Sequence, residues 1–122
     1  MAHLDLERAE RLLKSARSLF DQGDLAGVAG LAYQAFESAI IALSIEQTGV
    51  DPGSHTARRQ QAEGLVKEGR DKIDLLWEIR NVDCYGNPKP GEPKREVSRA
   101  EVEEALRTVE EIIQAVKRAL GY

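Results

Sequence analysis

The residues best suited to chemistry lie together where an apolar helix is expected to end. That predicted helix reaches Arg80 and Asn81, and Asp83 and Tyr85 follow directly, ahead of a loop rich in Pro and Gly. Arg80 carries a planar fork of N–H donors that suits phosphate or carboxylate. Asp83 is expected to pair with Arg80, and Tyr85 offers a ring face for a base and a hydroxyl for a hydrogen bond. A scaffold commonly places binding residues beside such a loop, so the segment is a candidate anion- or nucleotide-binding site.

Other interpretations of these side chains stay open at this point. Arg80 and Asp83 can form an ordinary ion pair near a helix terminus while Tyr85 covers the edge of the core, and periodicity alone favours this interpretation. His55 is a candidate imidazole for the same site, because its predicted helix can reach the end of the Arg80 helix. A cap or packing role is the commoner one for such a residue. No Gly-rich phosphate loop, His-Glu-x-x-His or di-metal carboxylate spacing is present, so neither a metal nor a cofactor is expected.

Composition indicates one water-soluble domain. The chain has 122 residues, 42% hydrophobic and 31% charged, which argues against disorder throughout. A net charge of −4 argues against a dedicated DNA-binding domain but allows a small nucleic-acid groove. The single Cys84 excludes an internal disulfide and a thiolate zinc cluster. No apolar run is expected to cross a bilayer, and the N-terminus lacks a signal pattern, so a cytoplasmic protein without a membrane partner is predicted.

Apolar residues recur at spacings of three and four along most of the chain, which indicates amphipathic helices. The predicted helices cover about 4–22, 24–48, 55–68, 71–81 and 98–120. The last helix has the clearest start, because Ser98 and Glu101 are spaced as in a capping box. The expected fold is all-α, an up-and-down four-helix bundle with an additional short helix. Residues 1–122 form its single domain, with a loop at about 84–97.

Four segments together resemble the HEPN domain family. Gly23–Leu25 opens an Ala-rich second helix, and the turn Gly49–His55 is similar to the family's Gly–Pro–His entry into its third helix. Arg80–Gly86 resembles the family's Arg-x-x-Ala-Asp-Tyr-Gly variant, and Ser98–Leu120 is similar to its closing amphipathic helix. The resemblance covers nearly the whole chain.

One position departs from the pattern of the family's RNases, which carry Arg, a polar residue, three to five further residues and then His. Arg80 and Asn81 match its start, but Tyr85, Gly86 and Asn87 stand where the His would fall. RNA cleavage is helped by an acid or base that titrates near neutrality, which Tyr and Asn do not supply. The resemblance therefore implies a nucleotide- or RNA-binding module without RNase activity.

In that module, the resemblance assigns nucleotide or RNA binding to four residues: Arg80, Asn81, Asp83 and Tyr85. Arg80 would hold a phosphate, Asp83 would orient Arg80, and Tyr85 would stack or donate a hydrogen bond. Whether the protein is an enzyme is left open. If it is, Arg80 and Asp83 are the catalytic candidates.

The resemblance also implies partners, and two other functions remain alternatives. HEPN domains commonly form homodimers in which each subunit's Arg faces a shared cleft, and they occur in toxin–antitoxin modules beside a nucleotidyltransferase. The small residues of the second helix also suggest a partner in a second copy. The first alternative is an RNase toxin in which Asp83 or Tyr85 replaces the missing His. The second is a helical interaction or oligomerisation module that binds no ligand.

Overall fold

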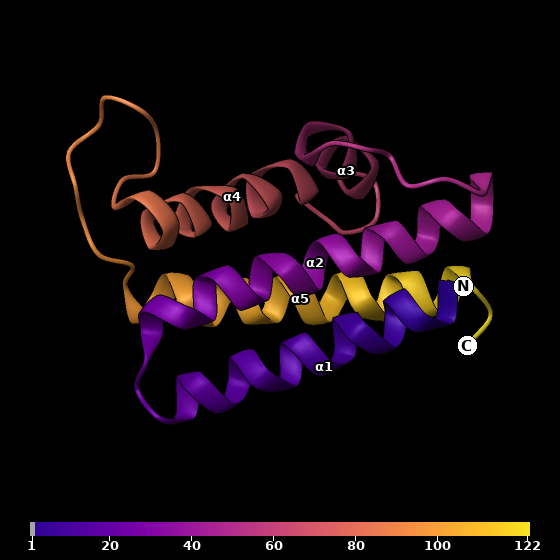
Figure 1. The fold of residues 1–122 in the computed structure, drawn as a ribbon, viewed down its shortest axis with the longest axis horizontal. Coiled ribbons are helices and arrows are strands. Elements are labelled where there is room, and N and C mark those ends of the chain that lie inside the picture. The colour runs from indigo at the N-terminus through magenta and orange to yellow at the C-terminus, as the bar shows by residue number, and fades with distance from the viewer. Residues whose placement is uncertain (1) are drawn as a thin grey trace.

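Five helices account for most of the chain in the computed structural model, which describes residues 2–122 (Figure 1). They are α1 (Ala2–Asp21), α2 (Leu25–Thr48), α3 (His55–Ala62), α4 (Gly69–Tyr85) and α5 (Arg99–Ala119). No strand occurs within the described residues. The predicted all-α fold of four long helices and a short one is confirmed.

Helix α2 is the centre of the bundle and contacts each of the other four helices. Its small residues Ala29, Ala32 and Ala35 are all at most 1% exposed. Small side chains let neighbouring helices approach closely, and here the neighbours belong to the same chain. The close neighbours of these three alanines are therefore helices of the same chain, and packing of α2 against a second copy stays a prediction.

Helix α2 is also a longer apolar segment than was expected from the sequence. By length and composition alone, α2 is apolar enough to cross a bilayer, with a mean hydropathy of 1.5 over its most apolar window. However, 67% of that window is buried inside the bundle, as in the core helix of a soluble protein. Its apolar character is thus accounted for by packing against the other helices.

Several predicted helix ends are confirmed by their hydrogen bonds. The Asp24 side chain accepts from the Gly27 N–H at the start of α2, and Gly49 ends α2 in the left-handed conformation. At the start of α5, the Ser98 side chain accepts from the Glu101 N–H and the Glu101 side chain accepts from the Ser98 N–H. Local sequence rules hold here because each cap is made within a few residues.

Helix α4 is longer than predicted. It was expected to run from about residue 71 to Arg80 and Asn81, but it begins at Gly69 and continues to Tyr85. No residue between Asn81 and Tyr85 disfavours a helix strongly. Gly86 is the first residue that adopts a left-handed φ, of 85°, and its N–H donates to the Val82 carbonyl. Asp83 and Tyr85 therefore project from a helix and not from a loop.

Helix α3 is shorter than predicted, ending at Ala62 instead of near Glu68. Turns follow it, and they place Leu65 and Val66 against the core. Glu68 has a left-handed φ of 57°, and Gly69 begins α4 where it was expected to end α3. A polar segment with few apolar residues does not gain enough by burial to continue as a helix.

The segment between α4 and α5 folds back on the end of α4. It was predicted at about 84–97, but its first two residues belong to α4 and it runs from Gly86 to the cap at Ser98. The Arg95 N–H donates to the Gly86 carbonyl at 2.9 Å, and Lys94 Nζ donates to the Tyr85 carbonyl at 2.5 Å. These contacts fix the loop at the end of the bundle away from the termini (Figure 1).

Candidate functional site

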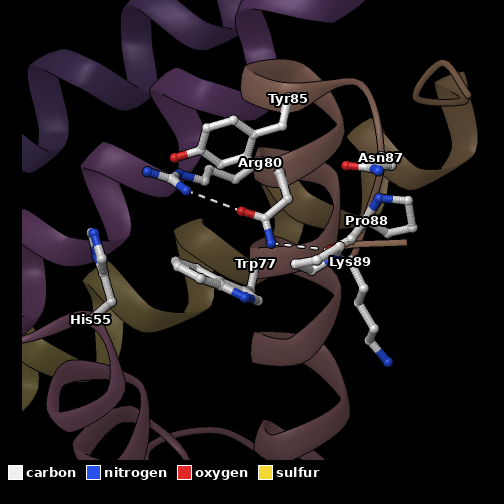
Figure 2. Close-up of a pocket in the computed structure, with 9 residues that line it drawn as sticks. His55, Trp77, Arg80, Tyr85, Asn87, Pro88 and Lys89 are labelled. Carbon is white, nitrogen blue, oxygen red and sulfur yellow. Dashed lines mark hydrogen bonds between the residues drawn. The ribbon is translucent and has the colours of Figure 1, made fainter. Parts of the chain in front are cut away.

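A pocket of about 530 Å³ lies where the α4–α5 loop meets α4 and the start of α3 (Figure 2). Its lining residues come from three places in the sequence. They are His55 from α3, Trp77, Arg80, Asn81 and Tyr85 from α4, and Asn87, Pro88, Lys89 and Pro90 from the loop. No carboxylate belongs to the lining. The pocket thus combines aromatic and proline walls with basic side chains, which suits an anion attached to a flat ring.

Arg80 is the central cation of this pocket. Its guanidinium carbon lies 5.0 Å from the ring centroid of Trp77, 5.5 Å from that of Tyr85 and 5.9 Å from that of Tyr33. One of its nitrogens, Nη1, donates to Asn81 Oδ1 at 3.0 Å. Among residues 2–122, Arg80 forms no ion pair with a carboxylate. The aromatic rings hold the guanidinium in place and leave donors for a ligand.

Asn81 lines the pocket beside Arg80, as the sequence suggested, but its amide is engaged within the protein. It is only 8% exposed, and both ends of its amide are occupied. Oδ1 accepts from Arg80, and Nδ2 donates to the carbonyl of Pro88 at 3.1 Å. Asn81 therefore connects the guanidinium to the loop, so its contribution is to position Arg80 and the pocket wall.

Asp83 lies outside the pocket, and its predicted pairing with Arg80 is wrong in this structure. Its carboxylate rests against α2, where a Cβ added at Gly30 would come within 2.7 Å of Asp83 Oδ2. Burial raises the pKa of Asp83, and the nearby charge of Asp24 raises it further. None of the ion pairs found within residues 2–122 includes Asp83. The longer α4 explains the error, because it fixes the direction of a side chain expected on a loop.

Tyr85 is the last residue of α4 and lies at the rim of the pocket, and its contact with a ligand stays a prediction. It lines the pocket and is 61% exposed, which makes it one of few large apolar side chains open to solvent. Arg80 lies over its ring, and Figure 2 shows the two side chains together at one wall. The exposed ring can therefore stack on a base while the guanidinium beside it holds a phosphate.

His55 is brought into the pocket from α3 (Figure 2). Its ring centroid lies 5.2 Å from that of Trp77, and its Nδ1 bonds Glu37 Oε2 of α2 at 2.5 Å. Arg58 Nη1 donates to the same carboxylate oxygen at 3.1 Å and its Nη2 to Asp51 at 2.9 Å. The sequence placed His55 near the Arg80 helix only as one option, and the structure brings the two together around Trp77.

Trp77 and Tyr33 were not predicted as site residues. Two guanidinium carbons lie close to the Trp77 ring, that of Arg59 at 4.7 Å and that of Arg80 at 5.0 Å from its centroid. Tyr33 is 2% exposed, and its hydroxyl has no hydrogen-bond partner within the described residues. Burial, followed by the charge of Glu37, raises the pKa of Tyr33. Trp77 precedes Arg80 by three residues, so helical spacing alone was a signal that they share a face.

Metal ligands are not gathered anywhere in the described chain. Within residues 2–122, no group of three or more His, Cys, Asp or Glu side chains is arranged to hold an ion. The pocket itself is lined by two cationic side chains, an imidazole, two amides, two aromatic rings and two prolines.

The family model described as HEPN domain matches residues 2–119. The search of curated proteins found no match for this chain. The family match supports a nucleotide- or RNA-related module at a general level, without naming a ligand or a partner.

Proposed function

The chain belongs to the HEPN domain family, and from this membership and the Arg80 pocket we propose that it binds a nucleotide or single-stranded RNA. Arg80 holds a phosphate, and Tyr85 stacks on a base or donates a hydrogen bond from its hydroxyl. Asn81 fixes Arg80 against the loop. Tyr85, Gly86 and Asn87 occupy the positions of the family's RNase histidine, so the proposed module does not cleave RNA through that motif.

The observation that carries this proposal is a partly buried guanidinium without a carboxylate. A charge taken out of water is costly unless a partner compensates it. Arg80 is compensated only by aromatic rings and by one amide oxygen among the described residues. A phosphate supplies the missing charge through two parallel hydrogen bonds.

The assembly and biological setting belong to the same proposal. We propose a cytoplasmic homodimer in which the two Arg80 pockets face one cleft, with a nucleotidyltransferase as a further partner in a toxin–antitoxin module. Sedimentation of the purified protein, alone and with a short RNA, tests the dimer. A monomer both with and without RNA would contradict it and would favour a helical module whose partner is a different protein.

The RNase alternative loses one of its two candidate bases, because Asp83 faces α2 and not the pocket. Tyr85 remains in reach of a ligand but is a weak base at neutral pH. We therefore retain binding as the proposed function.

Fluorescence anisotropy with a labelled short RNA, together with calorimetry with mononucleotides, tests binding. Arg80→Ala is expected to weaken the affinity about tenfold or more, since hydrogen bonds to charged groups contribute about 1.5–3 kcal/mol. Arg107→Ala is the matched control, because Arg107 is an exposed arginine on α5 that pairs with Glu104 outside the pocket. If both variants bind as tightly as the wild type, the Arg80 pocket is not the binding site.

A further inference from the structure

His55 is the one imidazole that lines the pocket. Its Nδ1 side contacts a cluster of charged side chains outside the pocket lining. Glu37 bonds its Nδ1, and Arg58 neutralises that carboxylate at 3.1 Å while also binding Asp51. The His55 side chain is 44% exposed, whereas Glu37 is 14% exposed. The ring is thus anchored on its protected side and open on the other.

This anchoring decides which nitrogen can meet a ligand. A carboxylate accepts hydrogen bonds, so the bond to Glu37 places the proton of a neutral imidazole on Nδ1. Nε2 is then an acceptor, and it has no hydrogen-bond partner among the described residues. The rings of Tyr33 and Trp77, with centroids 5.9 Å and 5.2 Å from that of His55, restrict the plane of the imidazole.

His55 and Arg80 flank the same ring. Their distances to the Trp77 centroid are 5.2 Å from the imidazole centroid and 5.0 Å from the guanidinium carbon. Figure 2 shows both side chains directed into the space between α3 and the end of α4. The pocket therefore offers hydrogen-bond donors for an anion close to an acceptor for a hydroxyl group. A ribose fits this arrangement, because it carries hydroxyl groups close to its phosphate.

We propose that His55, oriented by Glu37, accepts a hydrogen bond from a ribose hydroxyl of a ligand whose phosphate lies on Arg80, so that the pocket selects ribonucleotides over 2′-deoxyribonucleotides. This inference rests on the proposed function and adds to it a contact between the pocket and the ribose. In it, His55 is a specificity-determining contact and Glu37 is a positioning residue.

The test compares three labelled single strands of the same short uracil sequence in anisotropy titrations: RNA, DNA with deoxyuridine, and 2′-O-methyl RNA. The wild type is expected to bind the RNA about three- to tenfold more tightly than the other two, which corresponds to one neutral hydrogen bond. His55→Phe keeps a ring against Trp77 but removes the acceptor, and Glu37 remains paired with Arg58. This variant is expected to lose the preference for RNA and to bind the DNA as the wild type does.

A second pair of variants tests the positioning role of Glu37. Glu37→Ala removes the acceptor for Nδ1–H and is expected to lower the preference, whereas Glu37→Gln retains a carbonyl oxygen and is expected to keep most of it. Nitrogen NMR of the imidazole gives a separate readout, because the wild type should show a proton on Nδ1 and none on Nε2 when the ring is neutral. A merely structural role for Glu37 would leave this tautomer unchanged in Glu37→Ala.

Three outcomes would overturn the inference, and they are distinguishable. Equal binding of all three strands by the wild type leaves Arg80-dependent binding intact but removes the sugar contact. If His55→Phe weakens RNA binding and DNA binding equally, His55 contributes to binding without selecting the sugar. If the wild type binds none of the strands, the proposed function fails as well. Far-UV circular dichroism checks the folding of each variant. If His55→Phe does not fold, equal binding of the three strands by the wild type still overturns the inference, and the Glu37 variants still test the role of His55.

Discussion

The two sides of the last turn of α4 differ although their charged residues are only three positions apart. On one side, Arg80 faces an open pocket with aromatic walls and has no carboxylate partner within the described residues. On the other, Asp83 faces the start of α2 and lines a separate cavity of about 390 Å³ together with Asp24 and Arg95. The cation is presented to a ligand, whereas the anion is packed against the bundle.

This difference shows why a motif on a helix cannot be treated as one site. Residues at i and i+3 are neighbours on a helix surface, so a pair of opposite charges there is an obvious prediction. Arg80 instead lies over the rings of Trp77 and Tyr85, and Asp83 fits where Gly30 leaves room. The neighbouring helices, which the motif does not encode, decide the direction of each side chain.

The largest expected effect comes from reversing the charge on the pocket side. Arg80→Glu should weaken RNA binding about 30- to 100-fold, because it removes charge-assisted hydrogen bonds and adds repulsion toward phosphate. Asp83→Asn, on the other side of the same turn, should leave the affinity within about twofold of the wild type. Anisotropy titrations at one fixed salt concentration measure both. A loss of affinity in Asp83→Asn as large as in Arg80→Glu would show that the two sides act as one site.

A smaller effect is expected where the pocket is joined to the loop. Asn81→Ala removes the acceptor for Arg80 and the donor to the Pro88 carbonyl, both of which are buried or partly buried. The free energy of unfolding should fall by about 1–2 kcal/mol, and RNA affinity should fall about three- to tenfold. Urea denaturation and anisotropy measure the two losses separately. Unchanged RNA affinity in a folded variant would mean that Asn81 supports the loop without positioning Arg80.

A substitution at Gly86 tests how the C-terminal end of α4, which carries both Arg80 and Asp83, is held in place. Its φ of 85° is left-handed, and an added Cβ would come within 2.9 Å of Lys94 Cδ. Gly86→Ala should therefore lower the free energy of unfolding by about 1 kcal/mol. Gly64→Ala is the matched control, because Gly64 lacks a positive φ and has no atom within 4 Å of an added Cβ. Equal denaturation midpoints for the two variants would show that the end of α4 is not restrained by this conformation.

The fold was largely predictable because its signals are local and periodic. The apolar repeats gave the number and type of helices, and the caps at Asp24, Gly49 and Ser98 are each made within three or four residues. The misplaced ends of α3 and α4 are different. They depend on the packing of Leu65 and Val66 and on the loop that folds over Asn81, which are contacts between distant segments.

The site was predictable in part for the same reason. Arg80 and Tyr85 stand out by residue type and position, and the structure places both in the pocket. Whether they bind a nucleotide remains a prediction. The expected pairing of Asp83 with Arg80 is not found among the described residues, because Asp83 rests against α2. The contact between His55 and Trp77 was not foreseen, since it requires α3 to be placed beside α4. Tertiary packing, which no local pattern contains, supplies this information.

The smallest expected effect concerns the cost of burying Asp83. Its folded pKa is raised above the ordinary value of 3.8, so the folded protein binds more protons than the unfolded chain between those two pKa values. The contribution of this carboxyl to the free energy of unfolding therefore falls as pH rises through that window. At neutral pH the destabilisation by the buried charge is fully present. Asp83→Asn should raise the free energy of unfolding at pH 7 by less than about 1 kcal/mol, because solvent screens a partly exposed carboxylate. The gain should vanish below the unfolded pKa, where Asp83 is neutral in both states. Urea denaturation of both proteins across this pH range measures it, and a variant that is less stable than the wild type at pH 7 would show that the charged Asp83 stabilises α2.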